Sequence, residues 1–324
     1  MTSPEWLIER GIGEDRAVLI EAGEIVEARI ALDGLTPAGS VIAARLANVG
    51  INGRNAVAIG EGGIEFLLPR GAPGVAQGAT LTIEVTREAI PGREPWKRPL
   101  ARATDKPVLI QPQLGLGGEA RELVFPAPHD ELERAGWDDL LDQARSGAVA
   151  FAGGELRISA TPAMTLIDVD GYLAPEELAV LGAAEAARAI RRLDIGGSIG
   201  IDLPTVANKR ARQAAAAAID RIVPQPFERT AVNGFGFVQI VRPRARASLI
   251  ELAEDHASFE ARALLRRAAF DAPGPKRLVV HPSLADVLER NTDWVAALAG
   301  QVGGAVELRR DPAVAIYGGY AEAA

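Results

Sequence analysis

The stretch that decides the fold is residues 165–205, TLIDVDGYLAPEELAVLGAAEAARAIRRLDIGGSIGIDLPT. It begins at 165–170 with a short apolar run that ends in acidic residues and Gly171, a pattern typical of a buried strand. Pro175 then opens a segment in which apolar residues recur at helical spacing up to Gly196, which predicts a helix. A second strand is predicted at 198–202, because the proline that follows cannot donate a hydrogen bond to a sheet.

The order strand, helix, strand implies that the two strands run parallel and are joined by a right-handed crossover. Asp168 and Asp202 then emerge at the same edge of the sheet. Neighbouring strands lie about 4.8 Å apart, so one carboxylate oxygen of each residue can reach an octahedral Mg²⁺ ion at about 2.1 Å. Such a pair suggests metal-assisted phosphoryl transfer. The alternative is that these acidic residues are solvated turn formers or helix caps.

Several motifs in this part of the chain follow the order found in one protein family. Gly153-Gly154 precedes I-D-V-D-G at 167–171, and G-F-G-F-V-Q-I-V-R-P-R follows at 234–244. Together these motifs resemble the catalytic core of the bacterial ribonuclease E/G family. The resemblance places Asp168 and Asp202 on the two metal-binding Asp residues of the family, and Asp170 on an Asn.

The resemblance implies a metal-dependent endoribonuclease that hydrolyses single-stranded RNA in RNA processing or decay. Its metal would be Mg²⁺, with Mn²⁺ as an alternative ion, and its candidate catalytic residues are Asp168, Asp202 and Asp170. Asp170 departs from the family pattern, because an ionised Asp only accepts hydrogen bonds where an Asn can also donate them. We expect Asp170 either to act as a third metal ligand or to reduce activity. The other interpretation is an RNA-binding paralogue with weak or lost nuclease activity.

Composition narrows the classes of protein further. The 324 residues include no Cys and only three scattered His, so disulfides, thiol chemistry and zinc sites are not expected. The Cys motif through which the family shares zinc between protomers is also missing, so a homodimer is not supported by a zinc link. No apolar run suits an export signal or a membrane span, and we expect a cytoplasmic protein that does not bind membranes. No G-x-G-x-x-G follows a predicted strand, which argues against a dinucleotide-binding fold.

The whole chain is predicted to be a multidomain α+β protein. Short strands at 41–46, 56–59, 64–68 and 81–85, separated by Gly- and Pro-rich turns, are typical of a small barrel. In the ribonuclease E/G family this position holds an oligonucleotide-binding barrel. The predicted units are N-terminal strands at 1–38, the barrel at 39–105, a reduced connecting region without the family's 5′-sensor segment at 106–150, an α/β catalytic domain with a parallel core at 151–247, and a small C-terminal α/β domain at 248–324, with a last strand at 314–317.

The net charge of −8 argues against a general nucleic-acid binder, but the charge is unevenly distributed. Between Leu203 and Ala247, eight Lys and Arg residues against two acidic residues give a local net charge of +6. We interpret this segment as a track for RNA phosphates, and the alternative is a solvated basic helix face. Arg242 and Arg244 are expected on one face of a strand, beside the helix that starts near Lys209. The residues predicted to bind RNA are Phe66, Lys97, Arg98, Lys209, Arg210, Arg212, Phe235, Arg242 and Arg244.

Overall fold

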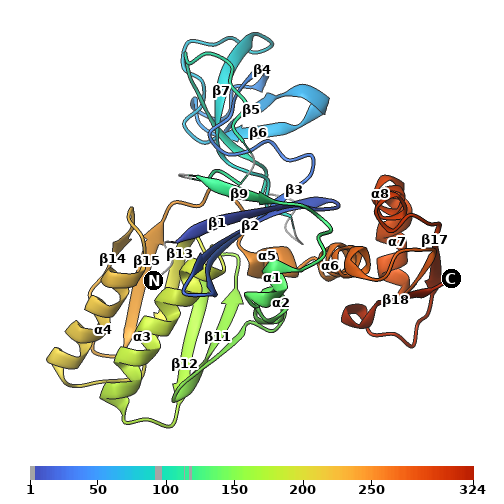
Figure 1. Cartoon of the computed structure of the whole chain (residues 1–324). Helices are drawn as coiled ribbons and strands as arrows, with labels where there is room; N and C mark the ends of the chain where they lie inside the picture. The colour runs from blue at the N-terminus through green and yellow to red at the C-terminus, as the bar shows by residue number, and fades with distance from the viewer. Residues whose placement is uncertain (1–3, 92–96, 113, 117–118) are drawn as a thin grey trace.

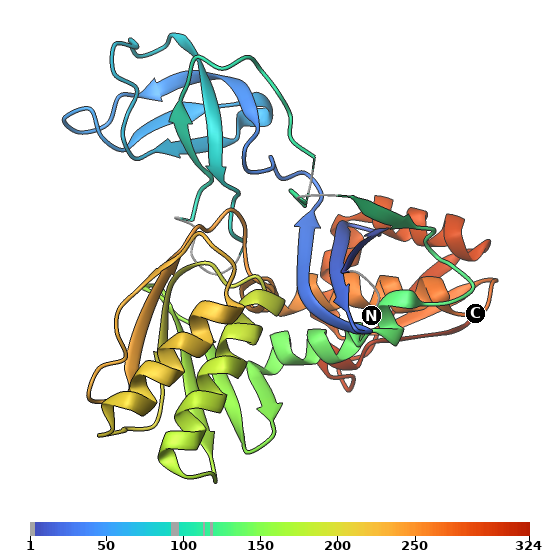
Figure 2. The ribbon, with the colours of Figure 1, turned by 60° about the vertical axis from the view of Figure 1, so that its left-hand side comes forward.

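A computed structural model describes residues 4–91, 97–112, 114–116 and 119–324. The protein is a mixed α+β chain with a closed five-stranded barrel and sheets of four, six and three strands. Figures 1 and 2 show the barrel standing at one end of the molecule, with the six-stranded sheet and the C-terminal helices on either side of the N-terminal strands. In the described part of the chain, no helix has the length and apolar character needed to cross a membrane.

The six-stranded sheet contains the predicted strand–helix–strand core. Its strand order is β10-β11-β12-β13-β15-β14, and β12 and β13 are parallel neighbours, as predicted. The helices α3 and α4 lie side by side on one face of this sheet (Figures 1 and 2). The elements are β10 (Ala148–Phe151), β11 (Gly154–Ala160), β12 (Thr165–Gly171), α3 (Pro175–Arg192), β13 (Gly197–Asp202), α4 (Lys209–Ile222), β14 (Glu228–Arg229) and β15 (Phe237–Arg242).

Buried and exposed residues alternate along β12, so that one face of the sheet is covered by helices and the other face is open to solvent there. In β12, Thr165, Ile167 and Val169 are buried beneath α3, and the residues between them are exposed. Close packing of α3 requires Gly182, because a Cβ atom there would lie 2.3 Å from Val169 Cγ1. The strand predicted at 165–170 is present as β12, but the expectation that it is buried holds for one of its faces only.

The N-terminal strands form a four-stranded sheet that contacts α3. Its order is β3-β2-β1-β9, and β9 joins the sheet parallel to β1 after the barrel is complete. Arg191 of α3 donates hydrogen bonds to Glu21 and Glu27, which tie the two sheets together through the helix. The elements are β1 (Glu5–Arg10), β2 (Glu14–Glu21), β3 (Glu24–Leu32), β9 (Ala120–Leu123), and the helices α1 (Glu131–Arg134) and α2 (Trp137–Ser146) that follow.

The predicted barrel is a closed barrel of five strands in the order β4-β5-β6-β8-β7. Four of its strands fall at the predicted positions, and β8 was not predicted. Apolar side chains fill the interior, including Leu46, Phe66, Leu68 and Ile83. The strands are β4 (Val41–Asn48), β5 (Ala56–Ile59), β6 (Glu65–Leu68), β7 (Thr80–Arg87) and β8 (Leu100–Ala103).

The C-terminal part combines helices with a three-stranded sheet of order β17-β16-β18. The strand predicted at 314–317 is wrong, because a short 3₁₀ helix, Ile316–Gly318, occupies this position and the strand follows it. The elements are α5 (Leu249–Ala253), α6 (His256–Phe270), β16 (Lys276–Val280), α7 (Pro282–Arg290), α8 (Thr292–Val302), β17 (Val306–Arg310) and β18 (Tyr320–Ala323).

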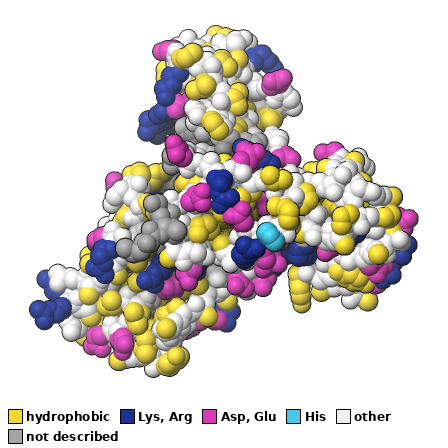
Figure 3. All heavy atoms as spheres, in the orientation of Figure 1, with side chains coloured by type: hydrophobic (Ala, Val, Ile, Leu, Met, Phe, Trp, Pro, Cys, Tyr) yellow, Lys and Arg dark blue, Asp and Glu magenta, His cyan; other side chains and the backbone are white. Residues whose placement is uncertain are grey.

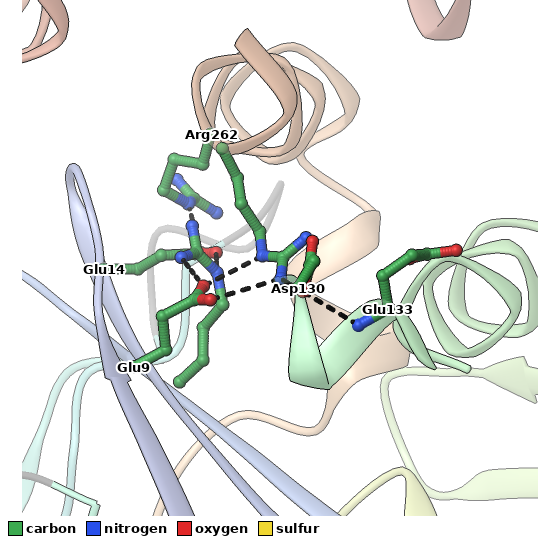
Figure 4. Close-up of polar contacts among 7 residues, drawn as sticks. Glu9, Glu14, Asp130, Glu133 and Arg262 are labelled. Carbon is green, nitrogen blue, oxygen red and sulfur yellow. Dashed lines mark hydrogen bonds and ion pairs between the residues drawn. The ribbon is translucent and has the colours of Figure 1, made fainter. Parts of the chain in front are cut away.

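Buried ion pairs join α6 to the N-terminal sheet (Figure 4). Arg266 Nε donates to Glu9 Oε1 at 2.8 Å, and Arg266 Nη2 donates to Asp130 Oδ1 at 2.6 Å. Arg262 Nε donates to Glu14 Oε2 at 2.7 Å. The side chains of Glu9 and Arg266 are only 2% and 3% exposed, so these charges depend on one another for solvation.

Candidate active site

Asp168 and Asp202 lie directly opposite one another on β12 and β13. Both side chains are exposed on the open face of the six-stranded sheet, away from α3. The predicted proximity of the two carboxylates is thus confirmed. It arises because β12 and β13 are adjacent parallel strands whose register pairs the last residue of β13 with the middle of β12.

Two further side chains extend this pair into a row across four strands. Arg157 of β11 lies opposite Asp168, and Phe237 of β15 lies opposite Asp202. Arg157 Nη2 forms an ion pair with Glu155 Oε1 at 2.6 Å on the same open face. Arg157 and Phe237 were not among the predicted site residues. Alternation within their strands could have placed them on the open face, but not next to the two Asp residues.

The carboxyl groups on the open face are close enough to affect one another. The pKa of Asp168 is raised above its usual value, first by partial burial and then by the negative charges of Asp170 and Asp202. The backbone N–H of Val169 opposes this shift. A cation held between Asp168 and Asp202 would relieve the repulsion, and the site therefore favours a positively charged ligand.

The two carboxylates of Asp168 and Asp202 suit Mg²⁺ better than a metal that needs many protein ligands. Among residues 4–91, 97–112, 114–116 and 119–324, no three His, Cys, Asp or Glu side chains are grouped to hold a metal ion. Mg²⁺ usually keeps several waters and binds proteins through one or two carboxylates. The pair Asp168 and Asp202 fits that requirement, whereas a third-ligand role for Asp170 has no support in this geometry.

Asp170 lies on the open face one residue pair further along β12. Its partner across β11 is Glu155, and it has no partner on β13, because that strand ends at Asp202. Its charge therefore adjoins Asp168 and does not complete a bridge to Asp202. This position explains why Asp170 raises the pKa of Asp168 without joining the carboxylate pair.

Phe235 lies at the tip of the loop 230–236, beside the end of β13. Its side chain is 81% exposed. Thr205 Oγ1 donates to the carbonyl of Phe235 at 3.2 Å, and this contact holds the loop against the segment after Asp202. Gly236 is required here, because its φ is +94° and a Cβ atom would lie 2.1 Å from the Leu203 carbonyl oxygen. An exposed ring held in this way is suited to stacking on a base.

The predicted cations at the start of α4 divide into two kinds. Lys209 and Arg210 are exposed on the first turn of the helix, seven and eight residues after Asp202 in the chain. Arg212 Nη1 instead donates to the carbonyl oxygens of Val206 and Ala207 at 2.7 Å each. Lys209 and Arg210 are therefore placed to meet a phosphate, and Arg212 mainly fixes the loop that leads into α4.

Arg242 and Arg244 were expected together on one face of a strand, and this prediction is wrong, because β15 ends at Arg242. Arg242 also lies far from the two Asp residues along the sheet. Arg242 pairs with Gly197 at the start of β13, whereas the carboxylate is at its end. Arg242 Nη1 donates to the Ile195 carbonyl at 3.1 Å, and Arg244 forms an ion pair with Glu251. The strand β15 runs antiparallel to β13. Its last residue, Arg242, therefore lies at the end of the sheet opposite to Asp202.

The barrel residues predicted to bind RNA are also differently placed. Phe66 is only 1% exposed in the barrel interior, so it cannot offer its ring to a base and that prediction is wrong. Arg98 Nη1 lies 3.0 Å from Glu65 Oε2, and Lys97 Nζ lies 3.9 Å from Glu251 Oε1. Trp96 precedes Lys97 in the same loop, where its ring could stack a base between cations, but it lies outside the described residues.

Ion pairs reduce the basic character of the segment 203–247. Arg229 forms two hydrogen bonds with Asp220, and Arg246 Nη1 lies 3.8 Å from Asp194 Oδ2. Figure 3 shows positive and negative side chains interspersed on the face that it displays. The local net charge of +6, which already counts Asp220, is thus partly balanced by Asp194 and Glu251 from outside the segment, and the continuous phosphate track is not supported.

The raised pKa of Asp168 gives a prediction for pH titration. Asp170→Asn and Asp202→Asn are each expected to lower the pKa of Asp168, because each removes a negative charge that raises it. Added Mg²⁺ should lower this pKa further, and Mg²⁺ affinity should fall as the pH drops through it, because the proton and the metal compete. The measurement is the ¹³Cγ chemical shift of Asp168 as a function of pH. A pKa that is the same in both variants and with Mg²⁺ would contradict the proposed interaction.

The amino-acid sequence was also compared with known proteins. The chain matches no protein-family model and no curated protein. The geometry of the open face therefore carries the functional argument.

Proposed function

We propose that this protein is a metal-dependent endoribonuclease that cleaves single-stranded RNA by hydrolysis. The observation that carries the proposal is the pairing of Asp168 with Asp202 on the open face of the sheet, where the pKa of Asp168 is raised by neighbouring carboxylates. The motif resemblance to the ribonuclease E/G family supports the same activity. It also supports Mg²⁺, or Mn²⁺, as the metal.

Asp168 and Asp202 would hold the metal ion, each through one carboxylate oxygen. A bound Mg²⁺ supplies charge neutralisation at the scissile phosphate and lowers the pKa of a bound water. Arg157 lies next to Asp168 in the row and can contact a phosphate oxygen. To do so, its guanidinium group would give up the ion pair with Glu155. Its position beside the carboxylate pair makes it the candidate electrostatic partner for the reacting phosphate.

The remaining contacts to RNA would come from both sides of the carboxylate pair. Phe235 supports base stacking because its ring is exposed and its loop is fixed beside β13. Lys209 and Arg210 support binding of RNA phosphates because both side chains are exposed on the first turn of α4. An oligonucleotide-binding role for the barrel rests on its closed five-stranded form. Since Phe66 is buried, RNA would contact the barrel through polar groups on its surface.

An RNA-binding protein with weak or lost nuclease activity is the second candidate. The observation that favours it is Asp170, whose negative charge lies beside Asp168 where an anionic phosphate must approach. Retention of the Asp168 and Asp202 pair argues for cleavage, since RNA binding alone does not require two carboxylates on the binding face.

The decisive experiment is an incubation of 5′-labelled single-stranded RNA with the protein in Mg²⁺, in Ca²⁺ and in EDTA. We expect internal cleavage in Mg²⁺ that is lost in EDTA, with 5′-phosphate and 3′-hydroxyl product ends. RNA binding without cleavage in every condition would support the second candidate. An absence of both binding and cleavage would show that the proposed function is wrong.

A further inference from the structure

A second charged site lies at the end of the six-stranded sheet where β13 begins, opposite to the end that carries Asp202. It is a cavity of about 220 Å³, which we call the arginine pocket, and its main lining residues are Arg29, Asp194, Arg242, Arg244 and Arg246. At about 30 Å³ for each water molecule, it has room for roughly seven waters. Four guanidinium groups and one carboxylate therefore face a space that is large enough for a small oxyanion.

Three of the arginines are anchored by hydrogen bonds and ion pairs with neighbouring residues. Arg29 Nη1 donates to the Gly115 carbonyl at 2.7 Å, and Arg246 Nη1 donates to the Leu114 carbonyl at 2.8 Å. Glu27 and Glu251 pair with Arg29 and Arg244. These contacts fix the guanidinium groups in place before any ligand arrives, and such preorganisation favours binding.

Several donors in this cluster are left without acceptors. The Nε atoms of Arg29, Arg244 and Arg246 are buried and have no hydrogen-bond partner within the part of the chain that the structure describes. A buried donor without an acceptor is costly, and groups of this kind often indicate an ion or water that completes the site. An oxyanion with several terminal oxygens is the ligand whose acceptors match guanidinium forks.

Asp194 occupies an unusual position in the arginine pocket. Its φ is +50°, in the left-handed region, where the residue after a helix is normally Gly. Its Oδ2 lies 3.8 Å from Arg246 Nη1. Burial raises the pKa of Asp194, although the charges of Arg246, Arg29 and Arg242 oppose the shift. The carboxylate thus limits the positive charge of the pocket, and its removal should strengthen anion binding.

Burial shifts the pKa values of two neighbouring residues. The pKa of Arg87 is lowered, mainly by burial and also by the charge of Arg244. The pKa of Glu88 is raised by burial, although Arg246 opposes the shift. Both observations indicate that charges around this cavity are poorly solvated by water, so a bound anion would interact strongly with the arginines.

We propose that the arginine pocket binds a phosphate group, from inorganic phosphate or from a nucleotide or RNA. The site is separate from the carboxylate pair, because Arg242 pairs with Gly197 and Phe237 with Asp202 at the two ends of β13. Five residues of strand correspond to roughly 17 Å. The proposal therefore does not depend on the proposed nuclease activity, and either can fail without the other.

Isothermal titration of the full chain with inorganic phosphate, at constant ionic strength and without Mg²⁺, tests the pocket. We expect one saturable site. Arg246→Lys keeps the charge but loses the fork, and should weaken binding about tenfold, as expected for one charge-assisted hydrogen bond. Asp194→Asn should tighten binding by a similar factor. A destabilised variant cannot easily explain opposite effects of two neighbouring substitutions.

The matched control is Arg221→Gln, which alters a different arginine-lined cavity and should leave phosphate affinity unchanged. Competition with uridine 5′-monophosphate and with RNA that carries hydroxyl ends then identifies the source of the phosphate. Displacement by the mononucleotide alone indicates a terminal or free phosphate, and displacement by both indicates the RNA backbone. No saturable binding, equal affinity in wild type and both pocket variants, or a loss confined to Arg221→Gln would overturn the proposal.

Discussion

Asp168→Asn and Asp202→Asn are each expected to reduce Mg²⁺-dependent cleavage of single-stranded RNA by roughly 10³-fold, a loss of about 4 kcal/mol of transition-state stabilisation. Each substitution removes one of the two charges that lie opposite one another on β12 and β13. Metal-free RNA affinity should not fall, because an Asp at this position repels an anionic substrate and the Asn does not. The measurements are initial cleavage rates at saturating Mg²⁺ and RNA affinity in EDTA.

Asp170→Asn is the matched control, because it removes the same charge from the same face of the same strand. It should keep or raise activity, since Asp170 lies beyond the end of β13 and outside the carboxylate pair. Wild-type rates in Asp168→Asn or Asp202→Asn would show that the metal site is elsewhere. A complete loss in Asp170→Asn would instead make Asp170 a metal ligand, which the geometry does not support.

Arg266→Met is expected to lower the free energy of unfolding by about 3–5 kcal/mol, because it removes one partner from a buried charge network. Glu9 would keep its charge in a site that is 2% exposed, and Asp130 would lose its contact at 2.6 Å. The measurement is urea unfolding followed by tryptophan fluorescence. One of the four Trp residues, the buried Trp137, has its ring about 6.0 Å from the Arg266 guanidinium carbon.

Arg277→Met supplies the control for this second experiment. Arg277 also forms an ion pair, with Glu307 at 3.2 Å, but both side chains are substantially exposed. Exposed pairs contribute about 0–1 kcal/mol, so the change in unfolding free energy should be small. If both variants lost the same small amount, the charges around Glu9 would not depend on one another as we infer.

The strand–helix–strand core could be predicted from sequence because its information is local. Helical spacing after Pro175 and the short length of the flanking strands leave parallel pairing as the simplest arrangement, and Asp168 and Asp202 then fall together. Arg157 could not be predicted as their neighbour, because the register between β11 and β12 depends on contacts distant in sequence.

The errors concern the direction in which side chains point. Phe66 was read as an exposed aromatic residue, but in a small barrel every second residue of a strand faces the interior. Arg242 and Arg244 were predicted to lie on one face of a strand, but β15 ends at Arg242 and Arg244 lies beyond it. The spacing of residues along a strand predicts which of them share a face. It does not predict at which end of the sheet these residues lie.

The position of the barrel in the chain has a kinetic consequence. The chain leaves the four-stranded sheet at Leu32, forms the barrel, and returns to the same sheet at Ala120. The barrel is therefore tethered at both ends to a single support, and the six-stranded sheet packs against that support through α3. RNA held by the barrel would reach the carboxylate pair as an intramolecular event, at an effective concentration that short tethers bring to about the millimolar range. Under the proposed function, a barrel that binds RNA weakly would still keep the carboxylate pair supplied with substrate, and it would release the products quickly.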